Sequence, residues 1–194
     1  MRSQNLMAII LDDHPLVCET LAAQVVEQGF GAGIGYQGAD VTSALAAIDE
    51  DHLWIAFVDA DLGTGIPAPD VVARLTNAGV RVALVSAQDH PATVQRCIVA
   101  GALAFLSKRD IATNLLAVMT ALTENTLLRS FDLLTMLTPA PDSPLTFDAA
   151  THQVLVFAGA GLPTAVIARR VGITPEQVSA IISDVWDAYA RGHS

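Results

Sequence analysis

The sequence predicts an α/β fold, in which a (βα)5 doubly wound parallel sheet is followed by a small all-α helix-turn-helix domain. Short, continuously apolar runs alternate with longer segments of helical period through the first two thirds of the chain. Strands that are apolar along their whole length are typical of a parallel sheet covered by helices on both faces. A proline cluster then interrupts the pattern, and only helical periods follow it. With 194 residues and 52% apolar content, the chain is large enough for two cores.

Each element of the sheet domain follows from its apolar spacing. We expect buried strands at 7–11, 54–58, 80–85 and 103–106, with 30–36 as the weakest strand. Amphipathic helices are expected between and after them, at 15–28, 40–50, 69–78, 91–100 and 110–124. The right-handed crossover rule then places helices on both faces of one open sheet.

The stretch "TPAPDSP", residues 138–144, has three prolines in seven residues and marks a linker. We therefore divide the chain into a first domain (1–125), a linker (126–144) and a second domain (145–194). The second domain has the pattern helix, glycine turn, short helix, "GIT" turn and final helix. Thr174 is the expected N-cap of that last helix, with Pro175 in its first position and Glu176 in its first turn. This order is typical of a helix-turn-helix.

Composition restricts the classes of function. The net charge is −10, which argues against broad electrostatic adhesion to nucleic acid or to an anionic membrane. Cys18 and Cys97 lie in apolar helical patterns and are expected to be core thiols in a reducing compartment. Residues 149–168 carry no Asp, Glu, Lys or Arg, but their polar residues, glycines and proline make them a poor membrane span. No cleavable signal precedes the first strand, so we expect a cytoplasmic protein.

Polar residues follow four of the five expected strands: Asp12 and Asp13, Asp59, Ser86 and Lys108. The carboxyl ends of parallel strands meet at one edge of the sheet, so these side chains should share a pocket. Three neighbouring acids repel one another unless a cation lies among them, and Mg²⁺ prefers such oxygen ligands. A carboxylate can act as a nucleophile toward phosphorus, which makes Asp59 the expected phosphoacceptor. The ammonium and hydroxyl groups would then neutralise and hydrogen-bond the phosphoryl oxygens.

Other interpretations fit fragments of this pattern. Taken singly, each of these residues is more typical of a helix cap, a turn or a solvated surface. "GIGYQG" at 33–38 matches the glycines of a dinucleotide-binding turn, but a helix rather than a strand precedes it. "DAD" at 59–61 fits a fragment of the haloacid-type phosphatases, which lack the double aspartate after the first strand. No Walker-type loop is present, and we expect a switch rather than an enzyme.

Residues 6–125 resemble the receiver domain of two-component response regulators, through "LDDHP", "VDADLG", "LVSA" and "GALAFLSK" in that order. The resemblance implies that Asp59 is phosphorylated by a histidine kinase or a small phosphodonor. It also implies that Asp12, Asp13, Asp59 and the main-chain carbonyl of Asp61 hold Mg²⁺, and that Phe105 is the aromatic switch residue. Gly63 and Arg109 stand where the family usually has proline, which affects the rate and lifetime of phosphorylation more than its chemistry.

The second domain resembles the LuxR-type output domain of the NarL/FixJ group. The matching positions are Val154, Leu155, Gly161, Leu162, Ile167, Ala168, Arg170, Gly172, Thr174 and Val178. Positions that contact DNA in the family carry Ser179, Ile181, Asp187 and Ala188, and Asp184 adds another acid. Arg169, Arg170 and Arg191 are the remaining candidates for phosphate contacts. The family's fourth helix has no counterpart before Ser194.

Two functions follow. The first is a phosphorylation-switched transcription regulator that binds DNA through its LuxR-like domain and pairs into a homodimer on activation. The alternative is a phosphorylation-switched interaction or dimerisation module whose degenerate helix-turn-helix does not bind DNA. In that case an apolar face of the last helix would meet another helix or a second copy; its residues are Ile181, Ile182, Val185, Trp186 and Tyr189.

Overall fold

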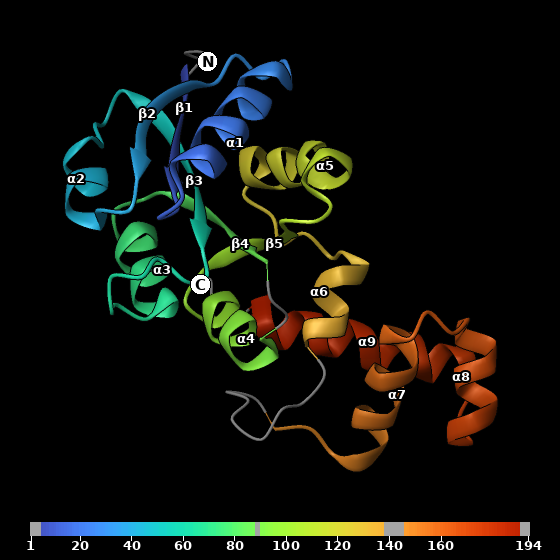
Figure 1. Ribbon diagram of the computed structural model, residues 1–194. Helices are drawn as coiled ribbons and strands as arrows, with labels where there is room; N and C mark the ends of the chain where they lie inside the picture. The colour runs from blue at the N-terminus through green and yellow to red at the C-terminus, as the bar shows by residue number, and fades with distance from the viewer. Residues whose placement is uncertain (1–4, 88–89, 138–145, 191–194) are drawn as a thin grey trace.

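The computed structural model describes residues 5–87, 90–137 and 146–190, and it confirms the predicted fold (Figure 1). Five parallel strands form one sheet in the order β2-β1-β3-β4-β5. The strands are β1 (Asn5–Leu11), β2 (Gly33–Gly38), β3 (His52–Asp59), β4 (Arg81–Ser86) and β5 (Ala102–Ser107). The helices of this domain are α1 (Pro15–Glu27), α2 (Val41–Ala46), α3 (Ala68–Asn77), α4 (Pro91–Val99) and α5 (Ile111–Glu124).

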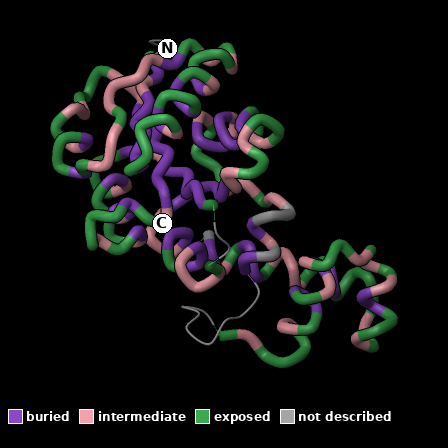
Figure 2. Tube along the Cα trace, in the orientation of Figure 1, coloured by how far each residue is buried: buried purple, intermediate pink, exposed green. Residues whose placement is uncertain are grey.

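The sheet is covered on both faces, so β1, β3, β4 and β5 are the most deeply buried part of the molecule, whereas the edge strand β2 is only partly buried (Figure 2). Helices α1 and α5 pack on one face, against residues such as Ala8 and Ile10. Helices α2, α3 and α4 pack on the other, against Ile9 and Leu11. Successive residues of a strand point to opposite faces, which is why the strands had to be apolar throughout.

Strand β2 runs through the glycines of "GIGYQG", so this motif is not the turn that a dinucleotide site requires. Ala8 pairs with Ile34 and Ile9 with Tyr36, which leaves Gly35 as an extra residue in the ladder. A Cβ atom on Gly35 would lie 2.4 Å from the ring of Trp54. The glycine therefore serves close packing and an irregular strand, as the sequence indicated.

The segment after α5 packs against the sheet domain. The amide of Leu128 donates to the carbonyl of Leu103, 2.7 Å away on the edge strand β5. A short helix, α6 (Phe131–Met136), follows inside the segment 126–144 that we expected to be a linker. Ser130 caps it by accepting from the Leu133 amide at 3.1 Å, and Leu133 is fully buried. The proline-rich stretch 138–144 lies outside the described residues.

Three helices form the C-terminal unit: α7 (Ala149–Gly159), α8 (Thr164–Val171) and α9 (Pro175–Ala190). They share a small core built from Val154, Ala158, Ile167, Ala168 and Val178. The predicted cap of α9 is confirmed, because Thr174 and Gln177 exchange two side-chain to main-chain hydrogen bonds of 3.2 Å and 2.9 Å. This reciprocal pair satisfies amides that a helix start leaves without partners.

The C-terminal unit is joined to the sheet domain through its last helix. In Figure 1, α9 runs behind α6 and reaches α4. Val185, Trp186 and Tyr189 of α9 belong to the same buried core as α4 and α6.

Both cysteines are buried free thiols, as predicted. Within the described ranges, no helix combines the length and apolar character needed to cross a bilayer.

Candidate functional site

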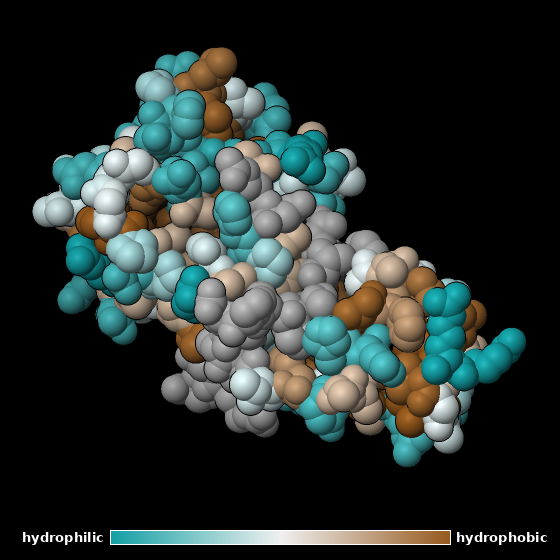
Figure 3. All heavy atoms as spheres, turned by 60° about the horizontal axis from the view of Figure 1, so that its bottom comes forward, coloured by the Kyte–Doolittle hydropathy of each residue, from teal (hydrophilic) through white to brown (hydrophobic). Residues whose placement is uncertain are grey.

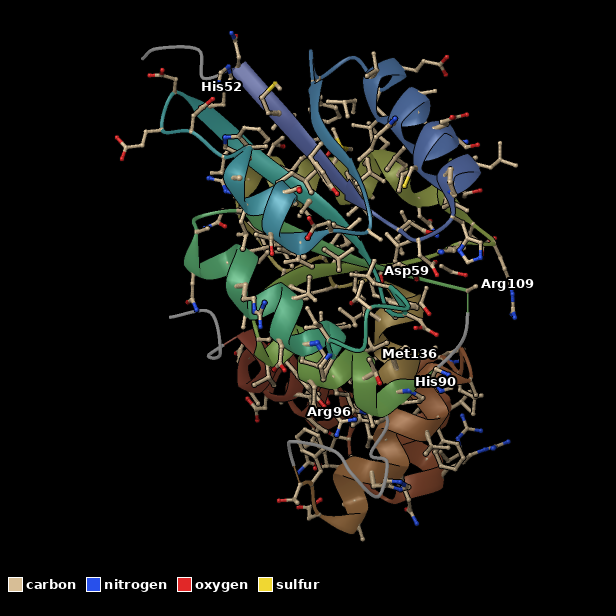
Figure 4. The ribbon with its side chains drawn as sticks, turned by 60° about the vertical axis from the view of Figure 1, so that its left-hand side comes forward. His52, Asp59, His90, Arg96, Arg109 and Met136 are labelled. Atoms are coloured by element: carbon tan, nitrogen blue, oxygen red, sulfur yellow. The ribbon has the colours of Figure 1, made fainter. Side chains whose placement is uncertain are left out.

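The strand ends bring the predicted site residues together at one edge of the sheet. The ammonium of Lys108 donates to Oδ2 of Asp12 at 2.5 Å and to Oδ2 of Asp59 at 2.8 Å. The two aspartates are only 5% and 6% exposed. Figure 4 shows Asp59 at the carboxyl end of β3, with His52 at the opposite end of the strand and Arg109 near the site, extending outward.

Main-chain hydrogen bonds fix the residues that follow each strand. The amide of Asp12 donates to the main-chain carbonyl of Gly38 at 3.1 Å. The amide of Ala60 donates in the same way to the carbonyl of Val85 at 2.9 Å, and the amide of Lys108 to the carbonyl of Ser86 at 2.8 Å. These bonds continue the pairing of neighbouring strands to the site. The functional side chains are therefore held on rigid backbone, which favours a fixed geometry for chemistry.

Burial and charge set the ionisation of the pair at the centre. Burial raises the pKa of the Asp59 carboxyl, whereas the hydrogen bond and charge of Lys108 oppose this rise. Burial alone would lower the pKa of Lys108, but its hydrogen bonds to Asp12 and Asp59 outweigh burial and raise it. Lys108 therefore stays protonated, and its charge helps to keep Asp59 in the anionic form that a nucleophile requires.

The acids also form a set of ligand atoms suited to a cation. Carboxylate oxygens of Asp12, Asp13 and Asp59 and a ring nitrogen of His14 all lie within 4.8 Å of one another. Three carboxylates against one ammonium leave excess negative charge, and a hard oxygen-seeking ion such as Mg²⁺ fits this donor set. His14 was not among the predicted site residues, and its Nδ1 lies 2.6 Å from Oδ1 of Asp13. Its place directly after the two aspartates was the available signal.

The loop after Asp59 frames the exposed side of the cluster. Asp61 is exposed, and its Oδ1 accepts from the Gly63 amide at 3.2 Å. Gly63 has φ of 64°, and a Cβ atom there would lie 3.0 Å from a carboxylate oxygen of Asp13. Proline cannot adopt this φ, so the proline that the family usually has at this position would not fit this loop. A cavity of about 240 Å³ opens beside Asp12 and Asp13, toward α1 and the end of β2.

The two expected switch residues lie on the α4 side of the site. Ser86 is 5% exposed at the end of β4, four residues before the His90 N-cap of α4. Phe105 is 3% exposed and belongs to the core cluster that contains α4, α6 and α9. Any movement of this ring would change the packing of these helices.

The residues expected at a DNA interface do not form one cluster, unlike the residues at the strand ends. Arg169 and Arg170 are exposed in the last turn of α8, and the guanidinium of Arg170 lies 5.3 Å from the centre of the Phe157 ring. Ser179 donates to the carbonyl of Pro175 in its own helix. Asp187 pairs with Arg129, which follows α5, at 3.0 Å. Arg191 lies outside the described residues.

The apolar face of α9 is divided between two cores. Ile181 packs in the small core of the C-terminal unit, and Ile182 contacts both cores. Val185, Trp186 and Tyr189 are buried with the sheet domain. The partner of this apolar face therefore lies in the same chain, in the core that α9 shares with α4 and α6.

Comparisons with known proteins agree with this architecture. A model of the response regulator receiver domain matches residues 8–120. The RcsB response regulator of Salmonella typhimurium aligns over 98% of this chain and 92% of its own, with 14% identity and a TM-score of 0.60. A structure of RcsB in complex with DNA covers 98% of this chain and 94% of its own, with 15% identity and a TM-score of 0.62. No curated protein sequence matches the chain.

A receiver domain alone gives a higher identity over a shorter stretch. The signal receiver domain of NarL from Mycobacterium tuberculosis covers 62% of this chain and 98% of its own, with 27% identity and a TM-score of 0.52. The RcsB alignments show that the fold is shared through the C-terminal helices. The predicted resemblance to NarL/LuxR-type regulators is thus confirmed at the level of fold, and the cluster of Asp12, Asp13 and Asp59 is typical of a receiver magnesium site.

Proposed function

The chain belongs to the response regulator receiver domain family, and from this premise we propose that Asp59 accepts a phosphoryl group in a Mg²⁺-dependent reaction. This phosphorylation would switch a C-terminal unit that regulates transcription by binding DNA. The observation that carries the proposal is the contact of Lys108 with both Asp12 and Asp59 at the strand ends. A receiver domain implies a histidine kinase as partner, and it is not an enzyme in the classical sense.

The residues of the site have distinct tasks in the proposed transfer. An Oδ atom of Asp59 attacks phosphorus, the bond from phosphorus to the donor's nitrogen or oxygen breaks, and the donor leaves with that electron pair. Lys108 holds the carboxylate in its anionic form and then neutralises a phosphoryl oxygen. The Ser86 hydroxyl donates to another oxygen. Asp12, Asp13, Asp59 and the main-chain carbonyl of Asp61 would hold Mg²⁺, which supplies further positive charge for the phosphoryl oxygens.

Switching is proposed to act through α4. Ser86 precedes α4 by a few residues, and Phe105 is buried against the core that α4 shares with α6 and α9. Attraction of Ser86 to a phosphoryl group and repositioning of Phe105 would change that core. Two packings of one core with different exposed surfaces make a two-state switch.

DNA binding is supported by the three-helix arrangement of α7, α8 and α9 and by a shared fold with RcsB, for which a DNA complex is known. Arg169 and Arg170 would supply the phosphate contacts. A known structure contains two RcsB dimers bound to two parallel DNAs, which supports pairing of this chain on activation.

A protein contact is the second candidate output, and the composition of α9 favours it. This helix carries Glu176, Asp184 and Asp187 but no Lys or Arg, so it contributes no cation to a DNA phosphate. Figure 3 shows apolar residues among polar ones at the right-hand end of the molecule, over the C-terminal helices. Val156 of α7 is 40% exposed. An apolar surface with few cations suits a protein partner better than DNA.

Two measurements test the proposal. Asp59→Asn should abolish uptake of label from acetyl phosphate in Mg²⁺, whereas Asp51→Asn, an exposed acid at the other end of β3, should retain it. Normal labelling of Asp59→Asn would overturn the phosphoacceptor assignment.

Binding to pooled genomic DNA fragments is then compared with and without beryllofluoride and Mg²⁺, while oligomeric state is followed in the same samples. Salt-sensitive retention that rises with beryllofluoride supports DNA binding; a change in assembly without retention supports the protein contact.

A further inference from the structure

We infer that Gln95 is the positioning residue through which α4 holds α6, and with it α9, against the receiver domain. Gln95 is completely buried, and its Nε2 donates to the main-chain carbonyl of Met136 at 2.7 Å. Met136 is the last residue of α6, where helix carbonyls lack partners within the helix. Figure 4 shows Met136 beside α4, whose Arg96 and N-cap His90 are also labelled. The hydrogen bond thus joins a receiver helix to the segment that leads toward the output unit.

Helix α6 connects the two units through apolar contacts as well. Leu133 and Leu137 are fully buried in the core that includes Val94 and Ile98 of α4. Trp186 of α9 lies in that same core and is 5% exposed. The polar link of Gln95 therefore sits within one apolar core, in which α4 packs against both α6 and α9. We call these three helices and their shared core the α4–α6–α9 interface.

The hydrogen bond gives this interface a sharp dependence on the position of α4. Apolar contacts weaken gradually as helices slide, but a hydrogen bond to a buried carbonyl is lost once its distance and angle leave a narrow range. The carbonyl of Met136 would then be buried without this donor, which disfavours the closed packing. A shift of α4 therefore releases α6 at its C-terminal end, and it loosens α9 as well, because α9 packs against the same helix α4. This consequence deepens the proposed function and rests on it, because phosphorylation is the proposed cause of the shift.

Hydrogen–deuterium exchange of the full chain, followed by mass spectrometry, tests the inference. Gln95→Leu keeps a similar volume but removes the donor. Without any phosphoryl mimic, we expect at least tenfold faster amide exchange in α6 and in the C-terminal half of α9, with β1 and β3 unchanged. Exchange within twofold of wild type in both helices would overturn the role of Gln95.

Matched variants separate positioning from general loosening of the core. Val94→Ala removes buried volume from the adjacent residue of α4 and leaves the hydrogen bond intact. Its effect on α6 and α9 should be less than a third of that of Gln95→Leu; an equal effect would overturn the inference. If Gln95→Leu does not fold, Gln95→Asn serves instead, because it keeps the amide but shortens the side chain, so that the donor no longer reaches the Met136 carbonyl. Faster exchange in α6 and in the C-terminal half of α9 supports the inference; exchange within twofold of wild type in both helices overturns it.

The outcome with beryllofluoride and Mg²⁺ distinguishes this inference from the proposed function. Wild type should open α6 and α9 only with the mimic, and Gln95→Leu should already be open without it. A wild type that ignores the mimic while Gln95→Leu is open contradicts the proposed function and supports the inference. A wild type that opens with the mimic while Gln95→Leu stays closed without it supports the proposed function and overturns the inference.

Discussion

Removal of the ammonium at the site should destabilise the fold, and a divalent cation should restore part of the loss. Lys108 is the only lysine of the chain, and it lies between the buried carboxylates of Asp12 and Asp59. Lys108→Met leaves both acids buried without this cation. Breaking a buried pair by removing one partner costs about 3–5 kcal/mol. Because the Lys108 side chain is 16% exposed, solvent screens part of this, and we expect a loss of about 2–3 kcal/mol in the free energy of unfolding.

Mg²⁺ acts on the same excess of negative charge. A ligand at one hundred times its Kd stabilises the folded state by about 2.7 kcal/mol. Because no ammonium competes for the acids, Lys108→Met should gain more from Mg²⁺ than wild type does. The deficit measured in EDTA should therefore shrink in Mg²⁺.

Urea unfolding followed by circular dichroism, in EDTA and in saturating Mg²⁺, measures these changes. Arg109→Met is the matched control, because it removes the adjacent, exposed cation and should cost less than about 0.5 kcal/mol. Two results would refute the reasoning. One is a loss in EDTA no larger than that of the control, and the other is a deficit that is the same in EDTA and in Mg²⁺.

Three further predictions concern the packing of β2, the cap of α9 and the burial of Cys97. Gly35→Ala should lower the free energy of unfolding by about 1–3 kcal/mol, because its Cβ would lie 2.4 Å from the Trp54 ring; Gly33→Ala, against the flexible Met7 side chain, should cost less, and the reverse order in urea unfolding would contradict the packing. Thr174→Ala should cost about 1 kcal/mol through loss of the α9 cap, measured by thermal unfolding, and an unchanged melting temperature would exclude this role. Burial raises the pKa of the Cys97 thiol to about 12. In the unfolded chain this thiol has its ordinary pKa of 9.0. Burial of the neutral thiol therefore makes its full contribution to the free energy of unfolding below pH 9, and this contribution is lost as pH rises toward 12. Ellman's reagent should label Cys97 at pH 8 only after unfolding, and rapid labelling of the native protein would contradict its burial.

The sheet and the site could be predicted because both depend on local patterns. Each buried strand is apolar along its length, and the residue after it belongs to the shared edge whatever the distant contacts are. Asp12, Asp59, Ser86 and Lys108 could therefore be placed from strand ends alone. The contact of His14 with Asp13 depends on a side-chain direction at the start of α1, which sequence spacing does not define.

Tertiary contacts decided the elements that the sequence did not reveal. Helix α6 has only six residues, too few to be stable alone, and it depends on burial of Leu133 and on the donor from Gln95. Its amphipathic pattern is too short to distinguish from an extended linker. The apolar face of α9 was recognised, but the pattern could not say whether its partner was another chain or the receiver domain itself.

The contacts of α9 show which forces hold the C-terminal unit in place. The pair of Arg129 and Asp187 is half exposed on both sides, and exposed pairs contribute only about 0–1 kcal/mol. Burial of a side chain as large as Trp186 contributes several times more by area. Apolar packing therefore holds α9 against α4 and the sheet domain, and the ion pair of Arg129 and Asp187 mainly fixes its orientation. An acid at position 187 that would oppose DNA phosphates instead pairs with Arg129 in the segment after α5, so intramolecular docking accounts for this acid of α9.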